Sequence, residues 1–226
     1  MTPEAIIFDK DGTLFDFEAT WSGAMVRLLD RLAPHDDGTV SAALGFDPEK
    51  MRFHPDSVAI AGTAQDTGRT LSPVVGRGVE EVVAIMDEIA MATPMVPVVD
   101  LATCLSALRQ ICPLAVVTND SEVPATRHIR EAGLDRLIGF LSGFDSGHGV
   151  KPAPGPLLAA AEAFGVDPAR VLMVGDSLHD LKAGRAAGMI NVGVLTGVAG
   201  ADVLAPYADV ILPDIGHLEG WISDRI

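Results

Sequence analysis

Asp9 and Asp11 lie two residues apart, directly after the apolar run at residues 5–8. Two carboxylates this close repel each other unless a cation or a proton lies between them. Mg²⁺ prefers oxygen ligands in octahedral geometry and usually binds one or two carboxylates together with water and substrate phosphate. The sequence therefore predicts a Mg²⁺ site whose ligands are Asp9, Asp176 and the backbone carbonyl of Asp11.

The side chain of Asp11, which this metal site does not use, suits proton transfer. A carboxyl group near an ester oxygen can protonate the leaving alcohol and later take a proton from water. Asp9 is then expected to be the nucleophile, because carboxylate attack on phosphorus forms an aspartyl-phosphate and divides one difficult hydrolysis into two easier steps. The expected chemistry is the hydrolysis of a small phosphorylated metabolite, with Asp9 and Asp11 as catalytic residues.

The phosphoryl group of such a substrate needs binding partners of its own. Thr118 offers a hydroxyl, and the backbone N–H groups that follow it, from Asn119 onward, point out of a predicted helix N-terminus where anions bind. Lys151 supplies a point charge that offsets the acidic cluster. Thr118, Asn119 and Lys151 are therefore the expected phosphate-binding residues.

Three short apolar runs, each ending in polar residues, predict how these side chains are brought together. Asp9, Thr118 and Asp176 each follow one of the runs directly. In an open parallel sheet, ligands bind beyond the carboxyl ends of the strands. We therefore expect the three residues to meet in one crevice. The three strands are expected at residues 5–8, 114–117 and 171–174.

Helical segments alternate with the predicted strands. Two of them end before Gly133 and Gly188, and glycine is the usual left-handed residue at a helix end. Alternation at these lengths predicts the α/β class, with a doubly wound parallel sheet. The expected helices are at residues 122–132, 178–187 and 201–207, with Ser121 and Ser177 as N-caps of the first two, and further strands are expected at residues 191–194 and 209–212.

More than eighty residues between the first strand and Leu101 break this alternation and are too many for a loop in a compact domain. Apolar residues at three- and four-residue spacing predict helices at 17–32 and 79–92. Two prolines in residues 93–97 exclude a helix there and indicate a return linker. The expected organisation is an α/β core at residues 1–15 and 96–226, with an α-helical cap domain inserted at 16–95.

Composition excludes several classes of protein. The 226 residues are 48% hydrophobic and 21% charged, as in an ordinary globular protein, and the net charge of −15 makes nucleic acid an unsuitable partner. The two cysteines have no metal-ligand spacing, no signal peptide is recognisable, and no stretch of 18 residues stays apolar. We expect a cytoplasmic protein with reduced thiols, no membrane partner, and a monomeric or homodimeric state.

Four segments of the chain, in order, resemble the motifs of the haloacid dehalogenase superfamily, in its phosphatase branch with a helical cap. The resemblance spans most of the chain and implies a Rossmann-like core, the roles given above, and Asp180 as a partner that orients the metal site. Segments 11–16 and 151–154 are similar to phosphoglycolate phosphatases, a likeness shared by many related phosphatases. The four segments are Asp9-Lys10-Asp11-Gly12-Thr13, Thr118 after a strand, Lys151-Pro152-Ala153-Pro154, and Gly175-Asp176-Ser177 followed by Asp180.

Three other functions would use a related site. A dehalogenase shares the Asp nucleophile but has no use for Asp11 or for a metal, so both Asp11 and Asp176 count against it. A phosphosugar mutase of the same superfamily would have the same site, and only substrate tests separate it from a hydrolase. A signalling receiver domain also accepts a phosphoryl group on an Asp at a strand end, but it would be about half as long and has no cap.

Several other residues near the motifs have simpler expected roles. Lys10 should point away from its neighbouring carboxylates, because side chains alternate along a strand, and so lie on the surface. His148 and His179 show no paired spacing for zinc and are expected to be polar filler. Lys50 reads as part of a solvated helix start. The possible substrate-reading residues of the cap are Trp21, Arg27, Arg52, His54, Arg69 and Arg77.

Overall fold

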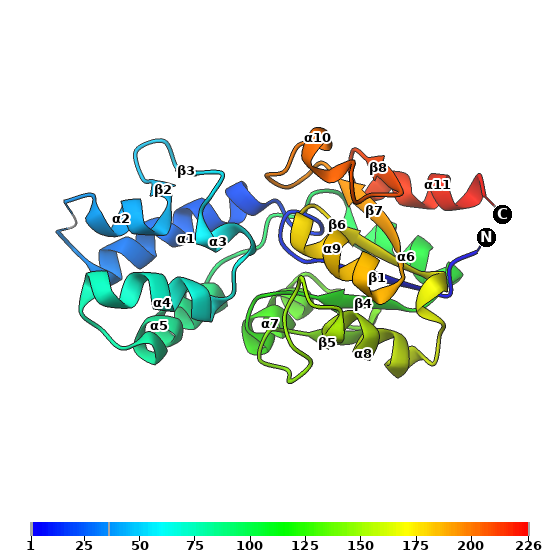
Figure 1. Cartoon of the computed structure of the whole chain (residues 1–226), viewed down its shortest axis with the longest axis horizontal. Helices are drawn as coiled ribbons and strands as arrows, with labels where there is room; N and C mark the ends of the chain where they lie inside the picture. The colour runs from blue at the N-terminus through cyan, green and yellow to red at the C-terminus, as the bar shows by residue number, and fades with distance from the viewer. Residues whose placement is uncertain (1, 36, 226) are drawn as a thin grey trace.

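Six strands form one sheet in the order β5-β4-β1-β6-β7-β8, in a computed structural model that describes residues 2–35 and 37–225. Every hydrogen-bonded pair of these strands is parallel. The chain adds β4 and β5 on one side of β1, then crosses back and adds β6, β7 and β8 on the other (Figure 1). The predicted doubly wound α/β sheet is confirmed. The strands are β1 (Ala5–Phe8), β4 (Leu114–Val117), β5 (Ile138–Ser142), β6 (Val171–Gly175), β7 (Ile190–Val194) and β8 (Val210–Leu212).

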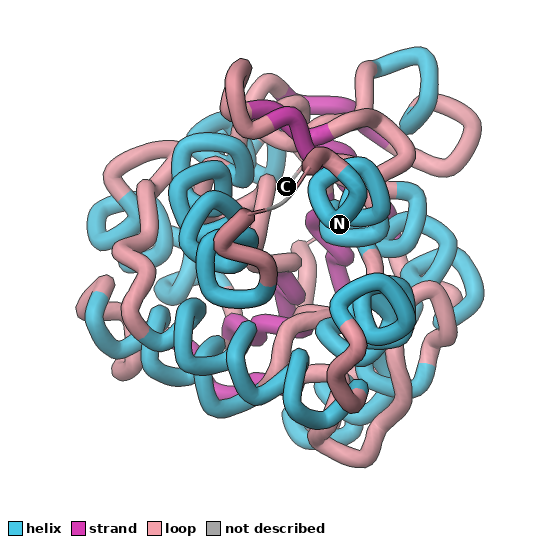
Figure 2. The backbone as a smooth tube through the Cα atoms, turned by 90° about the vertical axis from the view of Figure 1, so that its left-hand side faces the viewer, coloured by secondary structure: helices cyan, strands magenta, loops and turns pink. Residues whose placement is uncertain are grey.

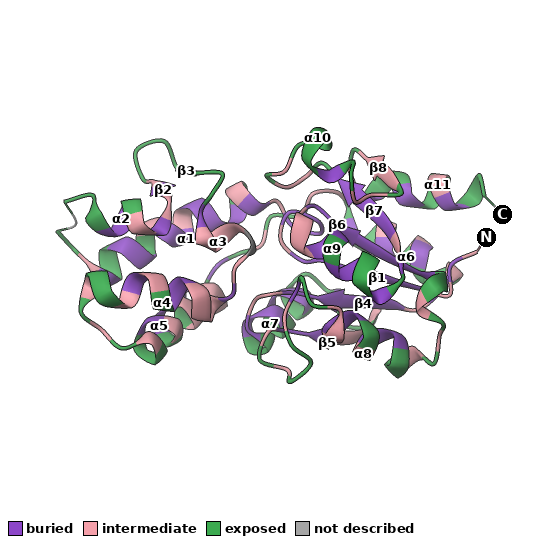
Figure 3. Ribbon diagram, viewed as in Figure 1, coloured by how far each residue is buried: buried purple, intermediate pink, exposed green. Residues whose placement is uncertain are grey.

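Helices cover both faces of this sheet, because the apolar side chains of the central strands alternate between them. Ile6 and Phe8 of β1 pack in a cluster with α6, α7 and α11, whereas Ala5 and Ile7 pack in a second cluster with α8 and α9. The central strands are buried from end to end (Figure 3). The helices are α6 (Leu101–Ile111), α7 (Glu122–Glu131), α8 (Gly155–Phe164), α9 (Leu178–Ala187), α10 (Ala201–Leu204) and α11 (Leu218–Ser223), with short 3₁₀ turns at Pro168–Arg170 and Ile215–His217.

Residues 17–91 fold into a separate group of helices beside the carboxyl ends of the strands (Figures 1 and 2). Their apolar faces form a third hydrophobic cluster, which includes Trp21, Leu28, Leu71 and Ile85 and no residue of the sheet. The elements are α1 (Phe17–Leu32), α2 (Thr39–Leu44), β2 (Phe46–Asp47), β3 (Arg52–Phe53), α3 (Val58–Ala61), α4 (Ala64–Val75) and α5 (Val79–Met91).

The chain leaves and rejoins the sheet region at one place. The N–H of Asp16 donates to the carbonyl of Val96 at 2.8 Å, and Phe15 forms an antiparallel bridge with Pro97. Residues 93–97 contain no helix, as their prolines predict. With a hydrophobic cluster of its own and adjacent ends, the segment at residues 16–95 is proposed to be a cap domain inserted into a core made of residues 1–15 and 96–226.

The predicted strands and helices of the sheet region match the structure to within a few residues, with one exception. The helix expected at 201–207 ends at Leu204. Lys50 lies in the turn between β2 and β3, so the expected helix start there is wrong. The antiparallel pair β2–β3 is two residues long on each strand, too short for an apolar alternation that would identify it from sequence. None of the helices in the described parts of the chain is long and apolar enough to cross a membrane.

Candidate active site

The carboxyl ends of β1, β4 and β6 lie side by side, and they bring together residues that are far apart in sequence. Asp9, Thr118 and Asp176 follow these three strands and line one cavity. The cavity lies between the sheet and the helices of residues 17–91, and its volume is about 100 Å³. The remaining predicted site residues line the same cavity: Asp11, Asn119, Lys151 and Asp180.

Lys151 contacts two of the acidic residues that line the cavity, Asp9 and Asp180. Its Nζ donates to Asp9 Oδ1 at 2.5 Å, to Asp180 Oδ1 at 2.7 Å and to the carbonyl of Val117 at 2.8 Å. Burial alone would lower the pKa of Lys151, but the carboxylates of Asp180 and Asp9 outweigh burial and raise it. Lys151 is therefore a fixed positive charge against Asp9.

Asn119 holds the segment that carries this lysine. Its Nδ2 donates to the carbonyl of Lys151 and its Oδ1 accepts from the N–H of Lys151, both at 3.0 Å. The amide side chain thus fixes the backbone of Lys151. A phosphate contact at Asn119 would have to come from its backbone N–H, which is the group that the sequence predicts.

Asp9, Asp176 and Asp180 form a buried cluster in which one carboxylate oxygen from each lies within 4.8 Å of the others. Oxygen donors at this spacing fit a hard cation such as Mg²⁺. Asp180 uses both of its oxygens within the protein, since Oδ1 accepts from Lys151 and Oδ2 accepts from the N–H and hydroxyl of Ser177. Asp9 and Asp176 are thus the better placed of the three to bind an ion.

Asp176 is held in place by the turn after β1. The hydroxyl of Thr13 donates to Asp176 Oδ1 at 3.0 Å. Gly12 adopts the left-handed φ of 82°, and a Cβ at Gly12 or at Gly197 would overlap the Asp176 carboxylate. Two backbone segments therefore approach this carboxylate more closely than any side chain would allow.

Burial changes the protonation of the two leading carboxyl groups. It raises the pKa of Asp9 to about 6, against the opposing charge of Lys151. It raises the pKa of Asp11 to about 7, against the opposing charge of Lys10. A carboxyl that titrates near neutral pH can both give and accept a proton under physiological conditions, as an acid–base group must.

Lys10 is fully buried, so the expectation of a surface side chain is wrong. Its Nζ lies 2.5 Å from Asp11 Oδ2 and 2.9 Å from Asp120 Oδ2. The strand ends at Phe8 and the chain turns at once, with the carbonyl of Lys10 accepting from Leu14 and Phe15. Strand alternation therefore no longer applies at residue 10.

The charges around Lys10 reinforce one another. Burial would lower the pKa of Lys10, but Asp11 and Asp120 raise it to about 12. Burial would raise the pKa of Asp120, but Lys10 prevails and holds it below its usual value. Lys10 and Asp120 were not identified from the sequence as site residues. Lys10 lies inside the first motif, between two carboxylates, and Asp120 lies two residues after Thr118, so their positions beside motif residues were the available signal.

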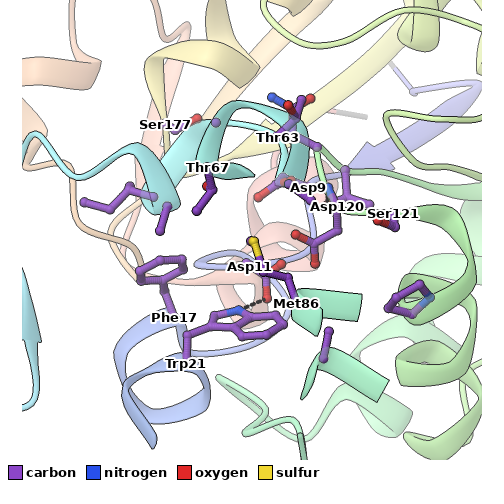
Figure 4. Close-up of a pocket in the computed structure, with 18 of the residues that line it drawn as sticks. Asp9, Asp11, Phe17, Trp21, Thr63, Thr67, Met86, Asp120, Ser121 and Ser177 are labelled. Carbon is purple, nitrogen blue, oxygen red and sulfur yellow. Dashed lines mark hydrogen bonds between the residues drawn. The ribbon is translucent and has the colours of Figure 1, made fainter. Parts of the chain in front are cut away.

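Trp21 of α1 contacts the Asp11 oxygen that Lys10 does not contact. Its Nε1 donates to Asp11 Oδ1 at 2.7 Å (Figure 4), and the ammonium of Lys10 lies 5.3 Å from the centre of its ring. Trp21 is one of the six residues that the sequence offers as substrate readers. The other five do not line the cavity in the described structure.

The two histidines near the motifs lie in different surroundings. His179 lines the cavity, and burial lowers its pKa, whereas His148 is exposed. Neither belongs to the cluster that could hold a metal ion in the described residues. Ser121 begins α7 as predicted, but its hydroxyl donates to Asp87 Oδ1 of α5 at 2.7 Å instead of capping the helix.

Helices α5 and α7 make a second contact next to the site. His128 Nε2 lies 2.8 Å from the carbonyl of Ala90, and because a carbonyl only accepts, Nε2 carries the proton. The ring also meets Trp21 edge-on, with 6.0 Å between centroids. Burial lowers the pKa of His128 to about 4, so the ring is neutral.

Residues 3–188 match the family model of the haloacid dehalogenase-like hydrolases. The chain therefore belongs to this family. It is an enzyme of the family's phosphatase branch, since it is 32% identical to the phosphoglycolate phosphatase of Neisseria meningitidis over 95% of this chain and 90% of that one. The phosphoglycolate phosphatase of Rhodospirillum rubrum is 30% identical over 98% and 91% of the two chains.

Solved structures share the fold. A haloacid dehalogenase-like family hydrolase from Streptococcus pneumoniae superposes with a TM-score of 0.72 at 18% identity, over 97% of this chain and 98% of that one. The family match favours a hydrolase over a receiver domain, which would be about half as long as this chain.

Proposed function

We propose that this chain hydrolyses small-molecule phosphate monoesters in a Mg²⁺-dependent reaction that passes through an aspartyl-phosphate on Asp9. The observation that carries the proposal is the contact of Lys151 Nζ with both Asp9 and Asp180 beside Asp176, at the ends of two adjacent strands. 2-Phosphoglycolate, the substrate in the names of the relatives, is one compound to test.

The metal is proposed to be held by the carboxylates of Asp9 and Asp176 and the backbone carbonyl of Asp11, with Asp180 orienting the group through Lys151 and Ser177. When bound, Mg²⁺ would neutralise charge on the phosphoryl oxygens and on the acidic cluster. Thr118, the N–H of Asn119 and the ammonium of Lys151 are proposed to bind the phosphoryl oxygens.

The first step is attack of the Asp9 carboxylate on phosphorus. The P–O bond of the ester breaks as the P–O bond to Asp9 forms, and the leaving alcohol takes its proton from the carboxyl of Asp11. In the second step water attacks the same phosphorus and gives a proton to the Asp11 carboxylate. Inorganic phosphate leaves, Asp9 is regenerated, and the sum is one ester and one water giving one alcohol and one phosphate.

The contacts of Asp11 suit this double role. Lys10 Nζ and Trp21 Nε1 hold its two oxygens from different directions, at 2.5 and 2.7 Å. A carboxyl fixed in this way cannot rotate away from the ester oxygen, and effective proton transfer requires such positioning.

The test is turnover of p-nitrophenyl phosphate with Mg²⁺, with excess chelator, and in the variant Asp9→Asn. We expect activity with Mg²⁺, loss of activity in chelator that added Mg²⁺ restores, and no turnover by Asp9→Asn. Asp56→Asn, at an exposed position of the helical segment, is the matched control and should keep full activity. Full activity in chelator, or turnover by Asp9→Asn, would contradict the proposal.

A further inference from the structure

The charged side chains that line the cavity are almost all acidic. Among the described lining residues the cationic side chain is Lys151, and it is already in contact with Asp9 and Asp180. His179 also lines the cavity, but burial lowers its pKa and favours the neutral ring. The acidic lining residues are Asp9, Asp11, Asp87, Asp120, Asp176 and Asp180.

The wall opposite the strand ends is mostly apolar. It is built from α1, β3, α3, α4 and α5, its acidic side chain is Asp87 of α5, and Figure 4 shows the rings of Phe17 and Trp21 next to each other on it. The polar side chains on this wall are few, and the hydroxyl of Thr63 donates to Asp66 in the cap of α4. The main apolar residues of the wall are Phe17, Trp21, Met25, Phe53, Met86 and Ile89.

The basic side chains of the same segment are directed elsewhere. Arg27 donates to Thr93 Oγ1 at 2.8 Å, and Arg77 pairs with Glu81 at 2.6 Å. The other described ion pairs of this segment are likewise on its surface and outside the cavity: Arg31 with Glu88, Arg52 with Glu18, Arg69 with Asp66, and Lys50 with Asp47.

We infer that the organic part of the substrate is uncharged and largely apolar, such as a short alkyl or aryl alcohol, and does not carry a carboxylate. This inference rests on the proposed phosphatase function and concerns the substrate class. The phosphoryl group takes up Lys151 and the proposed metal. Lys10 is already paired with Asp11 and Asp120 and does not line the cavity, so among the described lining residues no cationic side chain is left to pair with a second anion. Burying an unpaired charge is very unfavourable, whereas methylene groups placed against the apolar wall are stabilised because they leave water.

The experiment compares kcat/KM for matched phosphate esters of similar size with the full-length enzyme and Mg²⁺. Propyl phosphate and phenyl phosphate carry neutral groups, 2-phosphoglycolate carries a carboxylate, and phosphoethanolamine carries an ammonium group. We expect kcat/KM for propyl phosphate to exceed that for 2-phosphoglycolate by at least about tenfold, because a site that leaves a polar group unpaired discriminates strongly against it. Phenyl phosphate should be the better of the two neutral esters, although its more acidic leaving group also contributes.

A charge placed on the apolar wall should reverse part of this preference. Met86→Lys puts an ammonium group into the cavity from α5 and should increase kcat/KM for 2-phosphoglycolate relative to propyl phosphate. Ala84→Lys makes the same change in net charge on the exposed side of the same helix and should leave the ratio unchanged. The comparison of substrates with the unmodified enzyme does not depend on either variant folding.

The outcomes are distinct. A kcat/KM for 2-phosphoglycolate equal to or above that for propyl phosphate would overturn the inference and leave the phosphatase proposal standing. A clear preference for phosphoethanolamine over propyl phosphate would also overturn it, because the acids of the cavity would then select a cation. Absence of turnover for every ester, with Mg²⁺ present, would overturn the proposed function and this inference together.

Discussion

The two walls of the cavity differ in almost every physical respect. The wall formed by the strand ends carries buried carboxylates and Lys151, and Lys10 is buried beneath it; both lysines contact carboxylates at 2.5–2.9 Å. The opposite wall carries aromatic and aliphatic side chains from helices. Chemistry that develops charge needs preorganised charges around it, whereas selection of an organic group needs shape and apolar area. On this basis we propose that the reaction takes place at the wall of the strand ends and that the opposite wall selects the substrate.

The largest expected effect tests the acid–base group of the charged wall. Asp11→Asn removes proton transfer, which typically contributes 10²–10⁴-fold. The loss should be greatest for alkyl phosphates, whose alkoxides leave poorly. With an aryl phosphate the phenolate leaves unaided, so stopped-flow absorbance should show an initial burst of phenol followed by slow turnover. Equal losses for both ester types with no burst would show that Asp11 has a structural role only.

The next effect concerns the lysine buried behind Asp11. Lys10→Met leaves the carboxylates of Asp11 and Asp120 facing each other without a cation. Removing one partner of a buried ion pair typically costs about 3–5 kcal/mol in the free energy of unfolding. Denaturant unfolding should show this loss, and Lys10→Met/Asp120→Asn should recover part of it.

Lys50→Met is the control for that variant, because Lys50 also has a carboxylate partner, Asp47, but lies exposed on the surface. Surface ion pairs contribute little, so its unfolding curve should match that of the unmodified protein. Equal stability of Lys10→Met and Lys50→Met would show that the buried contacts of Lys10 do not stabilise the charged wall.

The contact between His128 of α7 and the carbonyl of Ala90 of α5 should weaken in acid. The pKa of His128 is lowered from 6.5 to about 4, mainly by burial and further by Lys10, while the carbonyl of Ala90, Asp120 and Glu131 act in the opposite direction. Between pH 6.5 and about 4, His128 is therefore protonated in the unfolded chain and neutral in the folded chain. The resulting stability is present above pH 6.5 and is lost as the pH falls toward 4, by on the order of 3 kcal/mol.

The measurement is the free energy of unfolding of the unmodified protein and of His128→Gln across this pH range. His128→Gln keeps a side-chain N–H donor and does not titrate, so its free energy of unfolding should fall less as the pH falls. The exposed His148→Gln should decline like the unmodified protein. Parallel curves for all three proteins would contradict the prediction.

The smallest effect concerns Trp21, a side chain of the apolar wall that donates a hydrogen bond to Asp11. Trp21→Phe removes the N–H that donates to Asp11 Oδ1 and keeps an aromatic ring. A hydrogen bond to a charged group is typically worth about 1.5–3 kcal/mol, so kcat for alkyl phosphates should fall by roughly 10- to 150-fold. The aryl phosphate should be affected less. Trp221→Phe, in α11 and away from the cavity, is the control and should change neither rate.

The charged wall was largely predictable from sequence and the apolar wall was not. Asp9, Thr118 and Asp176 follow short apolar runs, and the geometry of a parallel sheet brings the ends of such runs together whatever their separation. The aromatic residues of α1 follow the spacing of any amphipathic helix. That spacing shows which face is buried but not whether it packs on protein or lines a cavity.

Long basic side chains were harder to place from sequence than the carboxylates of the site. Lys10 was expected at the surface because strand alternation was extended past Phe8, where the chain already turns. The arginines of the helical segment were named only as possible substrate readers, and local acids three or four residues away pair with Arg69 and Arg77. A sequence shows such neighbours, although it does not show which partner a long side chain selects.

The adjacent linkers at Asp16 and Val96, joined by a 2.8 Å hydrogen bond, have a consequence for how this enzyme could be re-engineered. Because both ends of the proposed cap lie next to each other, the segment could be exchanged as a single insertion. A cap from another protein could be grafted there without moving any strand of the sheet, and its ends would start close together, so the entropy of closing the graft depends only weakly on its length. The charged residues would stay in place while the apolar wall was exchanged as one unit. Trp21 is the exception, because it would leave with the old cap, so a graft would need its own N–H donor for Asp11.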